Sequence, residues 1–260
     1  MKLKIFQADA FAEKVFMGNP AAVVPLEEWL PDELMQNIAL ENNLSETAFF
    51  IEATGGFHIR WFTPAAEVDL CGHATLASAH ILYKHLGYSE PEIQFNSRSG
   101  ILKVEFKNGL YNLDFPASAI KETAIPENLA TAFDFTPLEC WQGRDDLMLI
   151  FQDEDTIRSL KPDFNQIEKS GCRGVIVAAK GNDFDFVSRF FAPRVGVNED
   201  PVTGSAHTML IPYWASILGK KEMLACQVSK RSGIVHCEHL GERVKIGGKA
   251  VTFFEGEITL

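Results

Sequence analysis

The sequence has no excess of basic residues and no long apolar run, and each absence excludes a class of protein. Lys and Arg total 24 against 35 Asp and Glu, which gives a formal net charge of −11 at pH 7. A protein that binds a nucleic acid duplex needs a basic surface, so we expect no nucleic acid partner. The chain has no uninterrupted run of about 18 apolar residues, so we also expect no membrane-spanning helix.

Cysteine is scarce, and the common cofactor motifs are missing. The five cysteines are scattered and include no CxxC pair, which is typical of reduced thiols in a cytosolic protein. The N-terminal segment has no apolar core of a signal peptide, so we expect a cytoplasmic protein. No GxGxxG or P-loop pattern occurs, and the segment 236–239 offers at most two metal ligands on one strand face. We therefore expect no bound metal and no organic cofactor.

An internal repeat divides the chain at about half of its length. Arg-Trp-Phe-Thr-Pro at 60–64 is matched by Arg-Phe-Phe-Ala-Pro at 189–193, and an acidic stretch follows each copy. Gly72-His-Ala then corresponds to Gly204-Ser-Ala, and each copy closes with Leu-Gly after a largely apolar segment. These ordered matches indicate two similar lobes from a duplicated unit. We predict an N-terminal lobe over 1–116 and a C-terminal lobe over 117–260, whose last strand could cross to the first lobe.

The apolar segments that follow these glycines predict two buried helices. Small and apolar residues occupy nearly every face of 73–86 and 205–218, and a helix that is apolar all round is a core helix. Gly87 and Gly219 stand where a left-handed residue ends a helix. Pro212 predicts a kink or a break in the second helix. Many short strands surround both helices, so we expect an α+β fold of two pseudo-symmetric lobes, each a curved, mostly antiparallel sheet or barrel around a central helix.

The two predicted helix starts have the chemistry of an anion site. A helix N-terminus offers unpaired N–H groups and the positive end of the helix dipole. If a two-fold axis relates the lobes, the two starts face each other across a cleft. Such a cleft can hold a carboxylate or an enolate-like anion.

Several longer motifs follow one another between residues 9 and 207. They are Asp9-Ala-Phe, Gly18-Asn-Pro-Ala-Ala-Val, Leu44-Ser-Glu-Thr-Ala-Phe-Phe50, Phe62-Thr-Pro, Leu70-Cys-Gly-His-Ala-Thr75 and Glu199-Asp-Pro-Val-Thr-Gly-Ser-Ala-His207. In these motifs the chain resembles the PhzF (phenazine biosynthesis-like) family and, more distantly, diaminopimelate epimerase. The resemblance implies a two-lobed fold of the diaminopimelate epimerase type with an active site between the lobes. It also implies cofactor-independent isomerisation by proton transfer and a homodimer, for which the sequence shows no interface.

The resemblance also implies a set of site residues. In the family member that gives the name, a Glu moves a proton within a dihydro-hydroxyanthranilate ring, and Glu46 has a similar context. The other family positions fall on two side chains at the predicted helix starts and on one acidic residue. The implied catalytic residues are Glu46, His73 and Asp200, and the implied substrate-binding residues are Ser205, Gly72 and Gly204.

Each side chain also has a purely structural interpretation. Glu46 is either a general base with a pKa raised by desolvation or an exposed turn carboxylate. His73 either has a function, as a donor to a substrate carboxylate or as a proton relay near neutral pH, or satisfies a helix end. Asp200 either has a function, as a group that orients a substrate amine or as a partner of His73 in proton relay, or favours the positive end of a helix. Ser205 either holds a carboxylate or serves as an N-cap.

A lone cysteine separates the chain from the two-thiol epimerases. Cys71 precedes Gly72, but Val202 and Thr203 stand before Gly204, so one of the two thiols that those epimerases use as acid and base is missing. The sequence therefore favours a buried bystander role for Cys71.

We expect an isomerase that transfers a proton on a small, anionic, carboxylate-bearing metabolite in the cleft between the lobes. Two alternatives stay open from the sequence. One is a non-catalytic ligand-binding or interaction module on the same fold. The other is a racemase or epimerase that uses Cys71 as its only thiol.

Overall fold

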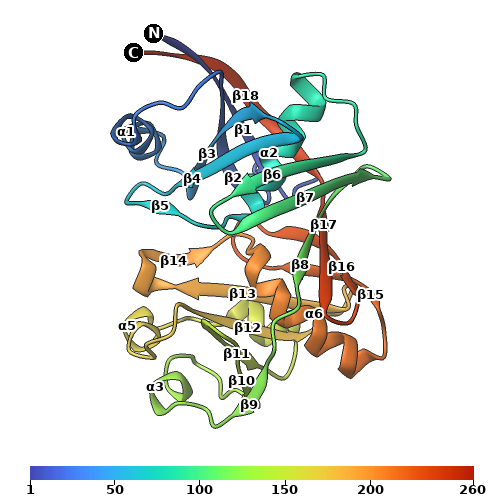
Figure 1. Cartoon of the computed structure of the whole chain (residues 1–260). Helices are drawn as coiled ribbons and strands as arrows, with labels where there is room; N and C mark the ends of the chain where they lie inside the picture. Colours follow the sequence, from blue (N-terminus) through green and yellow to red (C-terminus); the bar gives the residue numbers. More distant parts are fainter. The chain divides into compact units, whose positions relative to one another are not determined.

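Strands make up most of the regular structure, and a few helices pack against them (Figure 1). This arrangement confirms the predicted α+β class. The computed structural model describes all residues from 1 to 260. Contacts divide the chain into unit 1, which comprises Met1–Asp114 and Gly247–Leu260, and unit 2, which comprises Phe115–Ile246.

Unit 1 is a mostly antiparallel sheet with two helices. Strand β2 runs parallel to β3, β4 runs parallel to β6, and the other pairs are antiparallel, with β18 beside β1 at the two ends of the chain (Figure 1). Its elements are β1 (Lys2–Ala10), β2 (Asn19–Leu26), α1 (Asp32–Asn42), β3 (Glu46–Ala53), β4 (Gly56–Phe62), β5 (Glu67–Val68), α2 (Gly72–His85), β6 (Glu92–Ser97), β7 (Gly100–Lys107), β8 (Leu110–Pro116) and β18 (Ala250–Thr259).

Helix α2 is the buried helix that the apolar pattern predicts. Every residue from 73 to 82 is buried, so the helix has no solvent-facing side over these turns. It packs against β1, β2, β3 and β18. Gly87 follows the helix with a φ of 74°, in the left-handed region, as expected for a residue that ends a helix.

Unit 2 has the same kinds of element in its own sheet. Strand β11 runs parallel to β12, β13 runs parallel to β15, and the other pairs are antiparallel. Its elements are β9 (Lys121–Thr123), α3 (Glu127–Ala130), β10 (Glu139–Gln142), β11 (Asp146–Ile150), α4 (Glu154–Ser159), α5 (Phe164–Glu168), β12 (Gly174–Lys180), β13 (Phe186–Ala192), a 3-10 helix (Pro193–Val195), β14 (Val197–Asp200), α6 (Gly204–Leu218), β15 (Glu222–Gln227), β16 (Gly233–His239) and β17 (Arg243–Gly248).

Helix α6 continues through Pro212, so of the predicted kink or break, the break does not occur. Proline has no N–H to donate, and the Thr208 carbonyl one turn earlier therefore needs another partner. The backbone N–H of Ser118 donates to that carbonyl at 3.0 Å. An external donor thus replaces the missing helix hydrogen bond, and Gly219 ends the helix with a left-handed φ of 65°, as predicted.

The repeated arginines have the same role in the two units. Arg60 donates from Nε and Nη2 to the two carboxylate oxygens of Glu67, at 2.7 and 2.8 Å. Arg189 makes the same two-point contact with Glu199, at 2.8 and 2.9 Å. Such forked pairs fix the orientation of both side chains. In each unit the pair holds the acidic stretch that precedes the buried helix.

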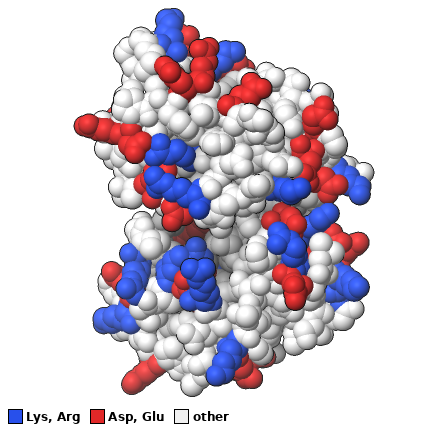
Figure 2. Space-filling model, viewed as in Figure 1, with Lys and Arg blue, Asp and Glu red and all other residues white.

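The surface carries charges of both signs. Lys and Arg alternate with Asp and Glu on the face shown in Figure 2, and no extended basic surface crosses it. None of the helices is both long enough and apolar enough to cross a membrane.

We expect Gly18→Ala to lower the free energy of unfolding by about 3 kcal/mol or more. Gly18 has a φ of 65°, and a Cβ there would lie 2.0 Å from the backbone oxygen of Ala10. The matched control is Gly87→Ala, which has a φ of 74° but no atom within 4 Å of the new Cβ. That change adds only the left-handed strain, about 1 kcal/mol. Urea unfolding followed by circular dichroism measures both, and equal losses would contradict the close backbone approach at Gly18.

Candidate active site

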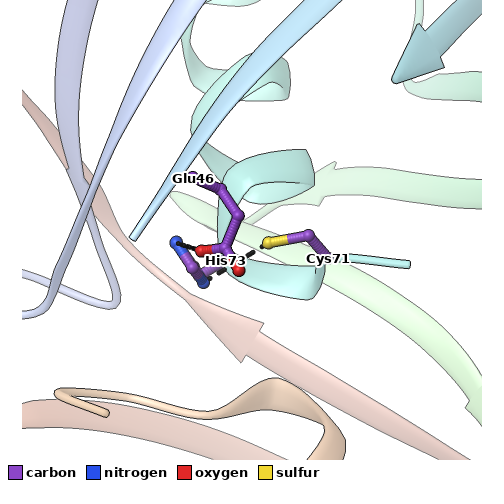
Figure 3. Close-up of side chains that lie close together, drawn as sticks. All are labelled: Glu46, Cys71 and His73. Carbon is purple, nitrogen blue, oxygen red and sulfur yellow. Dashed lines mark hydrogen bonds and ion pairs between the residues drawn. The ribbon is translucent and has the colours of Figure 1, made fainter. Parts of the chain in front are cut away.

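Glu46 is the first residue of β3, and its carboxylate points toward the start of α2 (Figure 3). The strand is held in register because β3 pairs in parallel with β2, with Glu46 opposite Ala21. The side chain is only 19% exposed, and Oε2 is fully buried. The interpretation of Glu46 as an exposed turn carboxylate is therefore wrong.

His73, the second residue of α2, lies against this carboxylate. Its Nε2 is 3.2 Å from Glu46 Oε2. The imidazole is buried because α2 is enclosed by strands up to its first turn. Burial lowers the pKa of His73 to about 3. The ring is therefore neutral near pH 7, and the expectation of a proton relay that titrates near neutral pH does not hold.

Asn19 determines which nitrogen of His73 carries the proton. Its amide Nδ2 lies 3.2 Å from His73 Nδ1, and the Asn19 side chain is completely buried. An amide NH₂ only donates, so Nδ1 accepts and the proton of the neutral ring resides on Nε2. Nε2 therefore carries the N–H group and lies 3.2 Å from Glu46 Oε2, although the two atoms do not form a hydrogen bond. The sequence includes Asn19 in a family-like motif but offers no signal for this role.

Cys71 completes a cluster of three chemically different side chains (Figure 3). It is buried at the N-cap of α2, and its Sγ lies 3.5 Å from His73 Nδ1. The thiol is buried, as the sequence leads us to expect, and it contacts the imidazole; its bystander role stays a prediction. One ligand atom each from Glu46, Cys71 and His73 lie within 4.8 Å of one another. Carboxylate, thiolate and imidazole are the donors that bind Zn²⁺, so these three are the residues that could hold a metal ion.

In unit 2, Asp200 is anchored at the end of β14. Its carboxylate accepts a short hydrogen bond from the hydroxyl of Thr203. Its backbone carbonyl accepts from Gln227 Nε2 at 2.7 Å and from Ser229 Oγ at 3.3 Å. The side-chain carbonyl of Gln227 in turn accepts from the backbone N–H of Thr203 at 2.9 Å. The buried Gln227 thus fixes the loop between β14 and α6.

Ser205 is the second residue of α6 and does not cap it. The N-cap is Thr203, whose hydroxyl binds Asp200 instead of the helix N–H groups, so the N-cap interpretation of Ser205 is wrong. Ser205 Oγ accepts a hydrogen bond from Arg173 Nη2 at 3.0 Å.

The predicted site residues fall into two groups. Unit 1 brings Glu46 together with His73 and the helix start at Gly72, and unit 2 places Asp200 and Ser205 on either side of the helix start at Gly204. The sequence did not reveal the residues that orient these groups, because polar residues in strands and loops carry no local pattern. They are Asn19, Arg173, Thr203 and Gln227.

Solved structures of other proteins share this fold. A phenazine biosynthesis protein of the PhzF family from Enterococcus faecalis has a TM-score of 0.98 and 46% identity, with 100% of both chains covered. A hydroxyproline epimerase from Agrobacterium vitis has a TM-score of 0.64 and covers 100% of this chain and 93% of its own. At 10% identity that second likeness shows a common fold alone.

The sequence relatives define the class of this enzyme as an isomerase. Residues 8–256 match the family model described as phenazine biosynthesis-like protein. A protein of Pseudomonas aeruginosa named as an uncharacterized isomerase is 50% identical, with 100% of both chains covered. The chain belongs to this PhzC-PhzF family, which confirms the resemblance seen in the motifs.

The buried histidines predict a loss of stability in acid. Burial lowers the pKa of His73 to about 3, and burial lowers the pKa values of His80 and His207 to about 4. An unfolded histidine titrates near 6.5, so below that pH the unfolded chain binds more protons than the folded one. Each residue should therefore reduce the free energy of unfolding by about 2 kcal/mol between pH 7 and pH 5.

The variant His207→Gln isolates one of these contributions. Its free energy of unfolding should fall by about 2 kcal/mol less than that of the wild type over the same interval. Urea unfolding at pH 7, 6 and 5 measures the difference. Identical pH slopes in the two proteins would show that His207 is not held neutral.

Proposed function

We propose that the protein is a cofactor-independent isomerase that moves a proton between two positions of a small, carboxylate-bearing metabolite. The contact of the Glu46 carboxylate with the neutral His73 imidazole is the observation that carries this proposal. A general base must be ionised, oriented and shielded from water. The buried first turn of α2 provides the shielding, and the His73 imidazole, whose Nε2 lies 3.2 Å from Oε2, limits the positions open to the carboxylate.

In the proposed reaction, Glu46 removes a proton from a carbon next to a carbonyl, enamine or carboxylate group. The electron pair of the broken C–H bond spreads into the conjugated system, and Glu46 becomes a neutral acid. Glu46 then returns the proton to another carbon of the same molecule, which restores the carboxylate. No electron leaves the substrate, so these two proton transfers need neither an oxidant nor a bound cofactor.

Asp200 and Ser205 have the supporting roles in this proposal. Asp200 orients the substrate, and Ser205 with the backbone N–H groups at Gly72 and Gly204 binds an anionic group. Helix starts suit this task because their N–H groups and dipole favour negative charge. The hydrogen bonds that fix Asp200 to Thr203 and Gln227 support a preorganised role. That one substrate meets both groups of residues stays a prediction.

Glu46→Gln should reduce isomerisation by about 100- to 10,000-fold, because the amide cannot accept the proton. A library of small carboxylates is first screened for thermal stabilisation of the protein. Proton–deuterium exchange of each hit is then followed by NMR in D₂O. The matched control is Glu52→Gln, which changes an exposed carboxylate of the same strand and should leave exchange unchanged. Undiminished exchange in Glu46→Gln would remove Glu46 from the mechanism.

A second candidate is a racemase or epimerase in which Cys71 is the acid or base. The position of Cys71 favours it, because its Sγ lies in the same cluster as Glu46 and His73, at the start of α2.

Cys71→Ala distinguishes the two candidates. We expect exchange in D₂O to stay within about tenfold of the wild type if Glu46 alone transfers the proton, since general acid–base groups contribute at least 100-fold. Cys140→Ala replaces another buried thiol and serves as the control. Loss of exchange in Cys71→Ala, with inversion of a stereocentre in the wild-type product, would favour the one-thiol reaction.

A further inference from the structure

Arg173 is a positively charged residue that the proposed mechanism does not yet use. It stands immediately before β12, and β12 runs parallel to β11 with Gly174 opposite Asp146. The start of one strand thus brings Arg173 beside the start of the other. Asp146 is 5% exposed, so this pair lies at the margin of the core of unit 2.

Three contacts hold the guanidinium group in one orientation. Its Nε donates to Asp146 Oδ1 at 2.9 Å, and its Nη2 donates to Asp146 Oδ2. Its centre lies 5.7 Å from the middle of the Phe190 ring. A forked pair combined with an aromatic contact leaves an arginine little rotational freedom. The side chain is nevertheless 42% exposed, so part of the fork faces outward.

The same guanidinium group determines the direction of the Ser205 hydroxyl. Nη2 donates to Ser205 Oγ at 3.0 Å, so the oxygen acts as an acceptor in this contact. A hydroxyl has one proton to donate, and an accepted bond from a cation leaves that proton for another partner. The hydroxyl is also a stronger donor because the neighbouring charge polarises it. Arg173 and Ser205 therefore present two donors side by side.

A depression beside Arg173 has room for a small molecule. Its volume is about 400 Å³, and it is lined by residues 142–147 and 170–173. This volume lies within the usual range for ligand sites, about 300–1,000 Å³. Arg173 is the residue that both lines the depression and contacts Ser205.

We propose that Arg173 and Ser205 form the subsite that binds the carboxylate of the substrate, an inference that rests on the proposed isomerase function. The Nη1 group of Arg173 and the hydroxyl of Ser205 each donate to one oxygen of a monoanionic carboxylate. Asp146 has a second role, because it neutralises part of the arginine charge. A doubly charged phosphate would meet the carboxylates of Asp146 and the neighbouring Asp145 and is therefore disfavoured. Arg173 is thus a specificity-determining residue for monoanions.

Arg173→Lys tests the subsite while it preserves the charge and the partner of Asp146. The probe is 2-aminobenzoate, a ring that carries one carboxylate, and its affinity is measured by isothermal titration calorimetry. Lysine has a single ammonium group and cannot bind Asp146 and a ligand in the fork geometry. We expect Kd to rise about 10- to 100-fold, the effect of losing one or two charge-assisted hydrogen bonds.

The matched control is Arg158→Lys, which alters another half-exposed arginine paired with a buried carboxylate, that of Glu154. It should leave Kd unchanged. Ser205→Ala provides a second test that keeps the ion pair, and it should raise Kd about 3- to 10-fold. Aniline and inorganic phosphate should bind much more weakly than 2-aminobenzoate to the wild type.

Three outcomes would contradict the proposal that Arg173 and Ser205 bind the carboxylate. They are an unchanged Kd in both Arg173→Lys and Ser205→Ala, no binding of 2-aminobenzoate to the wild type, or phosphate binding as tight as that of the carboxylate. Glu46→Gln separates this inference from the proposed function, because it should abolish exchange but retain probe binding. For a turned-over substrate, Arg173→Lys should raise KM and change kcat by less than about threefold, which a general loss of structure would not do.

Discussion

The burial of two apolar helices is the constraint on which the rest of the structure depends. Helix α2 is enclosed over residues 73 to 82, and α6 has a buried core face that includes its first residue, Gly204. A helix that is buried to its first turn carries the polar groups of that turn into a region of low dielectric constant. His73 is neutral for this reason. The same hydrophobic packing that stabilises each unit therefore sets the protonation state of the side chains at the helix starts.

Hydrogen-bonded partners then orient each of these side chains. In unit 1, Asn19 is hydrogen-bonded to His73 Nδ1, and His73 Nε2 lies 3.2 Å from Glu46 Oε2. In unit 2, Gln227 fixes the backbone between Asp200 and Thr203. A buried polar group without a partner is costly, so such chains hold their members in single orientations. Reactions that move one proton between fixed atoms require this kind of preorganisation.

The two units repeat one structural device but carry different chemistry. A forked Arg–Glu pair precedes the buried helix in both, from Arg60 to Glu67 and from Arg189 to Glu199. The helix caps differ, because Cys71 occupies the N-cap of α2 and Thr203 that of α6. The thiol contacts an imidazole, whereas the hydroxyl binds the carboxylate of Asp200. The two units thus share one framework but present different side chains at their helix starts.

The sequence by itself determined the α+β class, the two buried helices with their terminal glycines, and the family. These properties follow from apolar periodicity and short contiguous motifs, which a chain displays locally. Only the tertiary structure decided that Pro212 lies within an unbroken helix, because the compensating donor comes from Ser118, far away in the chain. It also decided that His73 is neutral, that Cys71 contacts it and that Arg173 binds Ser205. Protonation states and side-chain partners depend on burial and on residues brought together from distant strands, and no local pattern encodes them.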